Sequence, residues 1–387
     1  MMYLDHAAGA PMPASVIDTW VHAQQHFAAN PSSLHEPGNQ AARLLTLARK
    51  EIAAAVGGTP THLFFTAGGT EANHLALEAL TRSTPPVHAV TTTIEHPSVR
   101  SFFKKLEGAG TRVTWLSPAS DGVVTEEHLA AVLEPETSLV SVQFVNSETG
   151  IMQPVRALKR TAGDIPFHTD AVQALGKVPL DLFLLGVEAL SVSAHKIGGP
   201  KHMGAVCVKD CSVWTPAWPE TSQELGFRPG TVDVPGAAAF AAAVQALPSM
   251  ETALEAAWTK RERFIQALPP ETRIDEAADQ SPYIIGLRIA GIQGQYLLAL
   301  LDRRGISVST GTACTQGVED VSPVMEALHP GSPTEQGRFL RVSFGPTTSL
   351  EELERAAEAI CAIVESVRGE EHGRENAGRS EAEGVDP

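Results

Sequence analysis

The sequence is poor in cysteine, in runs of positive charge and in long hydrophobic runs, and each shortage excludes a class of protein. Its 29 basic and 45 acidic side chains give a formal charge of −16, and no run of five basic residues occurs, which argues against a nucleic-acid partner. The longest apolar stretch, around residues 236–247, is shorter than the roughly 20 residues that a membrane helix requires. The N-terminus has neither the basic nor the apolar region of a secretory signal. We therefore expect a soluble, cytoplasmic protein without a membrane partner.

Neither the histidines nor the cysteines form a metal-binding signature. His22 and His26 are four residues apart, but the residues between them lack the glutamate of the H-E-x-x-H motif, so we expect a surface helix and no metal. The four cysteines match no paired C-x-x-C spacing. Three of them are expected to have packing roles: Cys207, Cys211 and Cys361. Cys314 differs, because packing does not explain a cysteine in the small, polar stretch 309–315.

What the chain does have is enough apolar residues, 43%, for a sizeable core, and a regular alternation of short β-rich runs with helical patterns. The predicted strands cover residues 63–66, 88–92, 112–116, 139–145, 166–169, 190–193 and 205–208. The predicted helices between them include residues 71–80, 98–106 and 126–133. This alternation predicts an α/β fold with a mostly parallel seven-stranded sheet, covered on both faces, whose ligands gather at the carboxyl ends of the strands.

A second, smaller α+β region is predicted after Pro248. Its expected elements are a long helix, a strand over 284–289, a helix over 295–303, a strand over 306–308, a long polar loop, a strand over 339–344 and a final helix from Glu351. The predicted domains are a large one of residues 16–250 and a small one formed by residues 1–15 and 251–368. Residues 369–387 hold six acids and two arginines with almost no apolar side chain, which predicts a disordered acidic tail.

The first of three candidate motifs is a glycine turn, Phe65-Thr66-Ala67-Gly68-Gly69-Thr70-Glu71-Ala72-Asn73. Glycines let the backbone approach an anion, and the free N–H groups of a first helical turn bind phosphate. The turn lacks both the lysine of a Walker loop and the full G-x-G-x-x-G pattern. An ordinary strand-to-helix turn is therefore an equally good interpretation of this motif alone.

The second and third motifs place polar groups at strand ends. Asp170 follows a strand and Gln173 comes one helical turn later, although Asp170 can also be interpreted as a helix cap. Lys196 follows an apolar strand, where partial desolvation suits a Schiff-base lysine, whereas most lone lysines are surface charges. A phosphate turn, an acid and a strand-end lysine together match the needs of pyridoxal phosphate. The phosphate is anchored, the acid keeps the pyridine nitrogen protonated, and the lysine binds the aldehyde.

Further landmarks give the chain a specific resemblance. They are Tyr3-Leu4-Asp5-His6-Ala7-Ala8, Asn30-Pro31-Ser32-Ser33-Leu34-His35, Glu95-His96-Pro97-Ser98-Val99, Asn146-Ser147-Glu148-Thr149-Gly150, Arg228-Pro229-Gly230-Thr231 and Leu340-Arg341-Val342-Ser343-Phe344-Gly345. With these motifs the sequence resembles the NifS/IscS-like cysteine desulfurases of the class V aminotransferase family from Tyr3 to Gly345. The resemblance implies the fold type I of pyridoxal-phosphate-dependent transferases.

The resemblance also implies a role for individual residues. Lys196 is then the Schiff-base lysine, and Cys314 is the nucleophile that becomes a persulfide. The cofactor contacts that the resemblance implies are Asp170 with the pyridinium nitrogen, Gln173 and Asn146 with the ring oxygen, His96 stacked on the ring, and Gly69, Thr70, Ser193 and His195 with the phosphate. Thr231 reaches the phosphate from the second subunit of a homodimer. Arg341 grips the substrate carboxylate with its planar donor fork, and Asn146 lies beside the substrate.

The implied reaction converts L-cysteine to L-alanine and a persulfide on Cys314. Lys196 and His96 are the candidate proton carriers. The sulfur is expected to pass to a protein acceptor, for iron–sulfur cluster assembly or for thiolation of tRNA or cofactors. The segment from Gly311 to about Glu335 is long and rich in small and polar residues, which suits a loop that swings.

Two alternatives remain open from the sequence. A selenocysteine lyase needs the same cofactor set, and rates with both amino acids would separate the two. A non-catalytic scaffold homologue is the other alternative, and it is disfavoured because the five main site residues are intact: Lys196, Asp170, His96, Cys314 and Arg341.

The chain also departs from the family pattern in three places. Residues 219–222 replace a glycine-rich stretch, residues 281–285 lack a common asparagine, and His202 stands where glycine is frequent. These departures affect the substrate edge, the dimer edge and the branch of the family, and none falls on the Schiff-base, ring or nucleophile positions.

Overall fold

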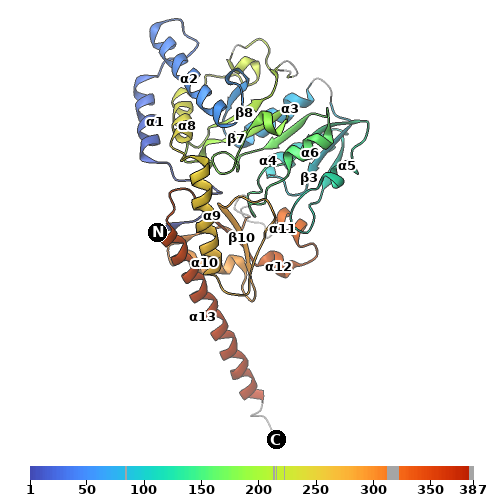
Figure 1. The fold of residues 1–387 in the computed structure, drawn as a ribbon, viewed down its shortest axis with the longest axis vertical. Coiled ribbons are helices and arrows are strands. Elements are labelled where there is room, and N and C mark those ends of the chain that lie inside the picture. Colours follow the sequence, from blue (N-terminus) through green and yellow to red (C-terminus); the bar gives the residue numbers. More distant parts are fainter. Residues whose placement is uncertain (83–84, 212–213, 215, 222, 312–321, 383–387) are drawn as a thin grey trace.

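The computed structural model describes residues 1–82, 85–211, 214, 216–221, 223–311 and 322–382. Figure 1 shows a broad α/β body, a smaller unit below it and one long helix that leaves the body at the C-terminal end. The strands are β1 (Met2–Tyr3), β2 (Leu63–Thr66), β3 (His88–Thr92), β4 (Arg112–Leu116), β5 (Thr137–Ser141), β6 (Phe167–Asp170), β7 (Ala189–Ser193), β8 (Gly204–Val208), β9 (Thr272–Ile274), β10 (Ile284–Ile289), β11 (Ile306–Ser307) and β12 (Phe339–Ser343).

The helices alternate with these strands through the first 210 residues, as predicted. They are α1 (Ala14–His26), α2 (Glu36–Ala55), α3 (Gly69–Thr81), α4 (Pro97–Gly108), α5 (Glu126–Ala130), α6 (Val155–Ala162), α7 (Leu182–Leu185), α8 (Val234–Gln245), α9 (Met250–Gln266), α10 (Gly294–Asp302), α11 (Pro323–Leu328), α12 (Pro333–Gly337) and α13 (Leu350–Ala382). Short 3-10 turns are η1 (Pro60–His62), η2 (Ala194–Lys196) and η4 (Gln223–Gly226).

The large sheet has seven strands in the order β2-β8-β7-β6-β5-β3-β4, which confirms the predicted fold. Its pairings are parallel except at β8, which runs antiparallel to both β2 and β7. β8 is therefore the one reversed strand of this sheet, and the carboxyl ends of the other six strands lie at the same edge. Predicted site residues follow β2, β3, β5, β6 and β7, so the topology brings them together at that edge.

Both faces of this sheet are buried. On β8, Ala205 and Cys207 join one hydrophobic cluster, whereas Val206 joins another on the opposite face. Successive side chains of a strand point to opposite faces, so this division shows a sheet covered on both sides. The buried position of Cys207 confirms its predicted packing role, and its burial raises the pKa of the thiol to about 12.

The predicted strand 139–145 is too long at its end. β5 stops at Ser141, although Val142 N and Phe144 N still donate to His168 O (3.1 Å) and Asp170 O (2.9 Å) of β6. The chain then folds back on itself, because Gln153 N donates to Phe144 O (2.8 Å) and Asn146 N donates to Ile151 O (2.9 Å). Asn146 lies in the turn that results.

The apolar stretch near residue 240 forms α8, which packs against α1 and α2. Nearly all of its small side chains are buried, and alanines let the neighbouring helices approach closely. In the described part of the chain no helix is both long and apolar enough to cross a membrane.

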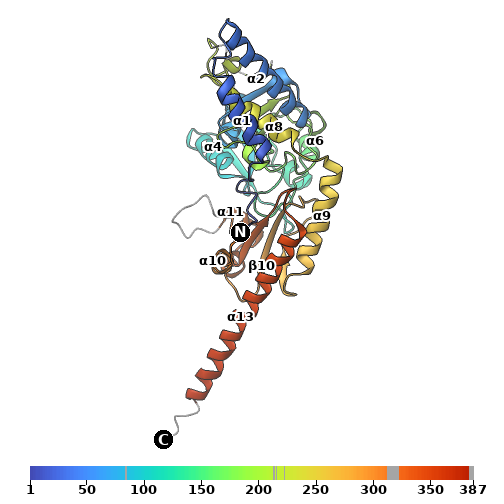
Figure 2. The ribbon, with the colours of Figure 1, turned by 90° about the vertical axis from the view of Figure 1, so that its left-hand side faces the viewer.

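The smaller unit contains a three-stranded antiparallel sheet, β12-β10-β9, and a separate parallel pair, β1 and β11. Leu4 lies in the hydrophobic cluster that α9, β10, β12 and α13 form, whereas Ala7 lies in the core of the large sheet. The N-terminal segment therefore contacts both units. Figure 2 shows α9, β10 and α13 together in this unit below the large sheet.

Two expectations for the C-terminal third are wrong. The polar segment up to about Glu335 contains two short helices, α11 and α12, which proline at the first turn and Ser322 as a side-chain cap help to start. The tail expected to be disordered from Gly369 continues α13 as far as Ala382, and Figure 2 shows this helix projecting from the body. Glutamate, alanine and arginine are strong helix formers, and no proline interrupts them before Pro387.

Candidate active site

The glycine turn after β2 forms a backbone cradle, and a side chain in place of Gly69 or Gly204 would fill it. Gly68 has φ of +123°, a conformation that favours glycine, and it begins α3 together with Gly69. A Cβ on Gly69 would lie 2.8 Å from Val172 Cγ2, and a Cβ on Gly204 would lie 2.6 Å from the Gly68 carbonyl carbon. These approaches leave no room for side chains. The N-terminus of α3, a 13-residue helix that Gly69 and Thr70 open, therefore presents bare backbone at the site edge.

Ser193 and His195 lie at the junction of β7 and η2. Ser193 Oγ and His195 Nδ1 are 2.8 Å apart and share a hydrogen bond. Ser193 Cβ lies 3.4 Å from the ideal Cβ position of Gly69, so these polar groups border the glycine cradle. Burial, with Lys196 and other nearby cations, lowers the pKa of His195 to about 4, which leaves a neutral ring at neutral pH.

Asp170 ends β6 and is buried with both carboxylate oxygens occupied by neutral donors. Asn73 Nδ2 donates to Asp170 Oδ2 (2.7 Å), and Val172 N donates to Asp170 Oδ1 (2.9 Å). Neither donor carries a charge, so the carboxylate is positioned without being neutralised by an ion pair. Such an arrangement leaves its charge to act on a third partner.

His96 belongs to the same hydrogen-bond network. Its Nδ1 shares a 2.7 Å hydrogen bond with Ser98 Oγ and accepts from Ser98 N (3.2 Å), which makes His96 the N-cap of α4. Ser98 Oγ in turn accepts from Asn73 Nδ2 (3.0 Å). Burial lowers the pKa of His96, while the Asp170 charge opposes this shift, and a neutral imidazole is able to take up a proton.

Lys196 lies in η2, immediately beyond β7, and its ammonium group faces the N-terminal segment. Lys196 Nζ donates to Ala7 O (2.7 Å) and to Ala8 O (2.9 Å). Gln173 Nε2 donates to the same Ala7 carbonyl (2.9 Å). Two residues that were predicted separately, Lys196 and Gln173, therefore meet at one backbone oxygen.

Asn146 is held in its turn by four hydrogen bonds. Its Oδ1 accepts from Glu148 N (2.9 Å), Thr149 N (3.0 Å) and Thr149 Oγ1 (3.2 Å). Its Nδ2 donates to Ile94 O at 3.4 Å, a long bond that a better acceptor would replace at little cost. Only the amino end of this amide is available to a ligand.

Arg341 comes from β12 in the smaller unit and reaches the N-terminal segment. Its Nη1 donates to Ser147 O (2.9 Å), and its Nη2 forms an ion pair with Asp5 Oδ1 (2.6 Å). Arg341 Nε is buried and has no hydrogen-bond partner in the described structure. The guanidinium thus has an unused donor in a buried position, while its charge is met by Asp5.

Cys314 lies outside the described residues, so its predicted role is not tested. The residues on both sides of that gap meet at Glu148. Ser322 Oγ lies 2.7 Å from each Glu148 carboxyl oxygen, and a Cβ on Gly311 would lie 2.6 Å from Glu148 Oε2. Burial raises the pKa of Glu148 to about 7.

Thr231 is not gathered with the other predicted residues. It is exposed and borders a separate cavity of about 430 Å³, to which Asn30, Arg49 and Glu224 also contribute. None of the other predicted site residues lines this cavity. Glu224 there has an unusual φ of 43°, and it is held by Arg49 and by Phe65 N (2.7 Å).

Several residues that complete the site were not predicted. Asn73 follows the glycine turn by one helical turn, Ser98 follows His96 by two residues, and Lys177 follows Gln173 by four. Helical spacing therefore contained a signal for Asn73 and Lys177 but not for Ser98. Asp5 lies 336 residues from Arg341, and no local signal pointed to that pair.

His22 and His26 were predicted to lie on a surface helix without a metal ion. The rings of His22 and His26 lie 4.5 Å apart on α1. Across the described ranges, no group of three or more histidine, cysteine, aspartate or glutamate side chains is placed to hold a metal ion.

Comparisons with known proteins agree with this geometry. A family model described as aminotransferase class-V matches residues 2–356. The chain is 39% identical to a putative cysteine desulfurase NifS of Bacillus subtilis (strain 168), with 96% of each chain covered. It is 32% identical to a cysteine desulfurase IscS of Dictyoglomus turgidum (strain DSM 6724 / Z-1310), with 95% of each covered.

Two solved structures are similar over nearly the whole chain. One is a NifS-like protein with a TM-score of 0.86 and 28% identity, which covers 94% of this chain and 99% of the other. The second is SspA in complex with cysteine, with a TM-score of 0.81 and 29% identity, which covers 90% of this chain and 100% of the other.

Proposed function

The chain belongs to the class V aminotransferase family, whose members use pyridoxal phosphate, and from this premise we propose that it is a cysteine desulfurase. The observation that carries the proposal is the meeting of Lys196, Gln173 and Asp170 beside the glycine cradle at one sheet edge. The names of the relatives and the cysteine bound to a structural neighbour support L-cysteine as the substrate.

The residues of this edge fit the cofactor in charge and in shape. The bare N-terminus of α3, with Ser193 and His195, would hold the phosphate, and Gln173 with the amino end of Asn146 would hold the ring oxygen. Asp170 would pair with the ring nitrogen, and His96 would lie against the ring. When bound, pyridoxal phosphate supplies an electron sink for the carbon next to the amino group of the substrate.

The side chains of the chain would then divide the remaining work. Arg341 would bind the substrate carboxylate, with its buried Nε as the unused donor. Lys196 and His96 would move protons at the substrate carbons, since a neutral imidazole can accept one. The Cys314 thiolate would attack the substrate sulfur.

The overall step balances without an external oxidant. The carbon–sulfur bond of L-cysteine breaks, a sulfur–sulfur bond forms on Cys314, and a proton is added to the carbon that sulfur leaves, so L-alanine departs. The persulfide would pass to a protein acceptor for iron–sulfur cluster assembly or for thiolation of tRNA or cofactors, in the cytoplasm.

A homodimer is supported by exposed apolar side chains and by the place of Thr231. Large apolar side chains of α1 and α2 are exposed: Ile17, Trp20, Val21 and Leu47. Thr231 borders a separate cavity rather than the Lys196 edge of its own chain, which supports a role in the site of a second subunit. Sedimentation of the purified protein would measure the dimer directly.

The reaction is tested by incubating the purified protein with L-cysteine. We expect released L-alanine and a mass increase of one sulfur atom on the peptide that contains Cys314, and C314S is expected to lose the added sulfur. Alanine release without sulfur on Cys314 would contradict the assigned nucleophile. Turnover of selenocysteine but not of cysteine would indicate a selenocysteine lyase.

A further inference from the structure

Lys177 is a buried lysine that the proposed reaction does not use. Its side chain is 5% exposed, and it stands four residues after Gln173 in a segment of consecutive turns. Gly176, its neighbour, has φ of +68°, and a Cβ there would meet Leu247 at 2.6 Å. The backbone next to Lys177 is therefore tightly placed, and the lysine has little freedom to choose another direction.

The contact that Lys177 makes is with the Gln173 amide. Lys177 Nζ donates to Gln173 Oε1 (2.9 Å), and Gln173 Nε2 donates to Ala7 O (2.9 Å). A backbone carbonyl only accepts, so the Gln173 amino group has to face Ala7 O, and the amide oxygen is left to accept from Lys177 Nζ. The amide therefore has a single orientation that satisfies both neighbours, with its oxygen toward Lys177 and its amino group toward Ala7.

This line of hydrogen bonds continues to Lys196. The Ala7 carbonyl that accepts from Gln173 also accepts from Lys196 Nζ (2.7 Å). A carbonyl oxygen has two lone pairs, and both are used here. The second amino hydrogen of Gln173 remains for another acceptor at the site.

We propose that Lys177 is a positioning residue, which holds the Gln173 amide so that its amino group faces the site beside Lys196. The inference rests on the proposed cofactor site, in which Gln173 binds the ring oxygen. Without Lys177, the Ala7 carbonyl alone would orient the amide, which would then present its oxygen, a group that repels the ring oxygen, for part of the time.

Burial of Lys177 has an electrostatic cost that an apolar side chain would avoid, but an apolar side chain could not donate to Gln173. Among the described ion pairs, none includes Lys177, and burial together with the Lys196 and Arg341 charges lowers the pKa of Lys177 to about 7. A buried amine without a carboxylate partner is costly to the fold. In the described structure, the hydrogen bond to Gln173 partly compensates for the burial of Lys177.

The test measures cofactor binding rather than turnover. Full-length protein is stripped of cofactor and titrated with pyridoxal phosphate, for the wild type, K177M, Q173A and the double variant K177M/Q173A. We expect K177M to weaken binding about tenfold and to shift the visible absorption band of the bound cofactor, as Q173A does. The double variant should bind no more than about twofold more weakly than Q173A alone, because Lys177 acts through Gln173.

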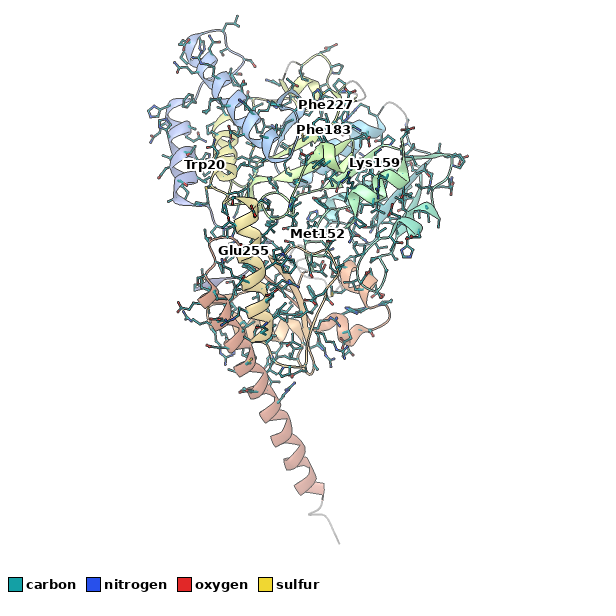
Figure 3. The ribbon with its side chains drawn as sticks, viewed as in Figure 1. Trp20, Met152, Lys159, Phe183, Phe227 and Glu255 are labelled. Carbon is teal, nitrogen blue, oxygen red and sulfur yellow. The ribbon has the colours of Figure 1, made fainter. Side chains whose placement is uncertain are left out.

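Lys159 provides a matched control on α6, where Figure 3 labels it. It is also a buried lysine, but it donates to Ile165 O (2.8 Å) and pairs with Glu188 (2.9 Å), none of which belongs to the site. K159M is expected to lower thermal stability while leaving the cofactor affinity and absorption band unchanged. If K177M does not fold, K177L takes its place in the same cycle.

Wild-type affinity and an unshifted band in K177M would overturn the inference. So would losses that multiply in the double variant, because Lys177 would then act independently of Gln173. Failure of the wild type itself to bind pyridoxal phosphate would instead contradict the proposed function, so the two failures are distinguishable.

Discussion

Asp170 and Arg341, the acid and the arginine of the site, are held in opposite ways. Asp170 accepts from two neutral donors of the large domain, whereas Arg341 already forms an ion pair with Asp5 of the N-terminal segment. The charge of Asp170 is thus positioned without being neutralised by another charge. The charge of Arg341 is already met, so an incoming carboxylate has to compete with Asp5 or bind at the unused Nε.

This difference indicates that the Asp170 side of the site suits a resident cofactor, whereas the Arg341 side suits a substrate that enters and leaves. A resident cofactor benefits from a carboxylate that is fixed and not neutralised by another charge. A substrate that enters and leaves at every turnover benefits from an arginine whose charge is not left buried and unpaired in between, since an unpaired buried charge is strongly destabilising. Asp5 performs this task in the described structure.

Removal of the Arg341 guanidinium should have the largest effect on activity among the changes that test this comparison. R341Q is expected to lower kcat/KM for L-cysteine about 100-fold, because a charge-assisted donor fork is lost while the half-buried Asp5 is left beside a neutral amide. Steady-state kinetics with L-cysteine measure this change. R338Q is the control, because Arg338 pairs with Glu335 (2.7 Å) and not with the site. Equal losses in both variants would refute the assigned role.

Removal of a neutral donor should have a smaller effect. N73A deletes the hydrogen bonds from Asn73 to Asp170 and to Ser98, so we expect kcat/KM to fall about tenfold. The same assay compares N73A with N39A, since Asn39 is exposed on α2. An N73A enzyme as active as N39A would show that Val172 N alone positions Asp170.

The smallest expected effect concerns Glu95, a second buried carboxyl near Asp170. Burial, together with the Asp170 charge, raises the pKa of Glu95 to about 8. The folded protein then keeps a proton on Glu95 that the unfolded chain has lost. The contribution of Glu95 to stability is therefore fully present below about pH 4.5 and is lost as the pH rises to about 8.

E95Q tests this sign, because glutamine imitates the neutral acid and does not titrate. We expect the free energy of unfolding of the wild type to fall relative to E95Q by about 1 kcal/mol per pH unit in this window. Denaturant unfolding at several pH values measures it, with E262Q as the control, because Glu262 is exposed. Parallel stability curves for E95Q and the wild type would contradict the raised pKa.

Local patterns predicted what is encoded locally. The strands β2, β3 and β4 begin and end where the alternation placed them. The predicted site residues follow β2, β3, β5, β6 and β7, which share one edge because these strands are parallel. The family resemblance supplied the roles, which local patterns alone left ambiguous.

Contacts between distant segments could not be predicted in this way. The pair of Asp5 and Arg341 depends on the packing of β1, β11 and β12, and no period in the sequence reports it. The extent of α13 was missed for a different reason. Composition identified an acidic, polar segment, but helix propensity and composition gave opposite answers for it, and the helix prevailed as far as Ala382.

The Ala7 and Ala8 carbonyls that hold Lys196 have a consequence for the order in which the molecule is assembled. They lie almost 190 residues before the lysine, and the segment that carries them is anchored near Ser343 and Ser307. Contacts between such distant parts of a chain form late in folding, because a large loop has to close first. A nascent chain can therefore form most of the large sheet before Lys196 makes its hydrogen bonds to Ala7 and Ala8. We expect the ability to capture the cofactor to be among the last properties that the protein acquires.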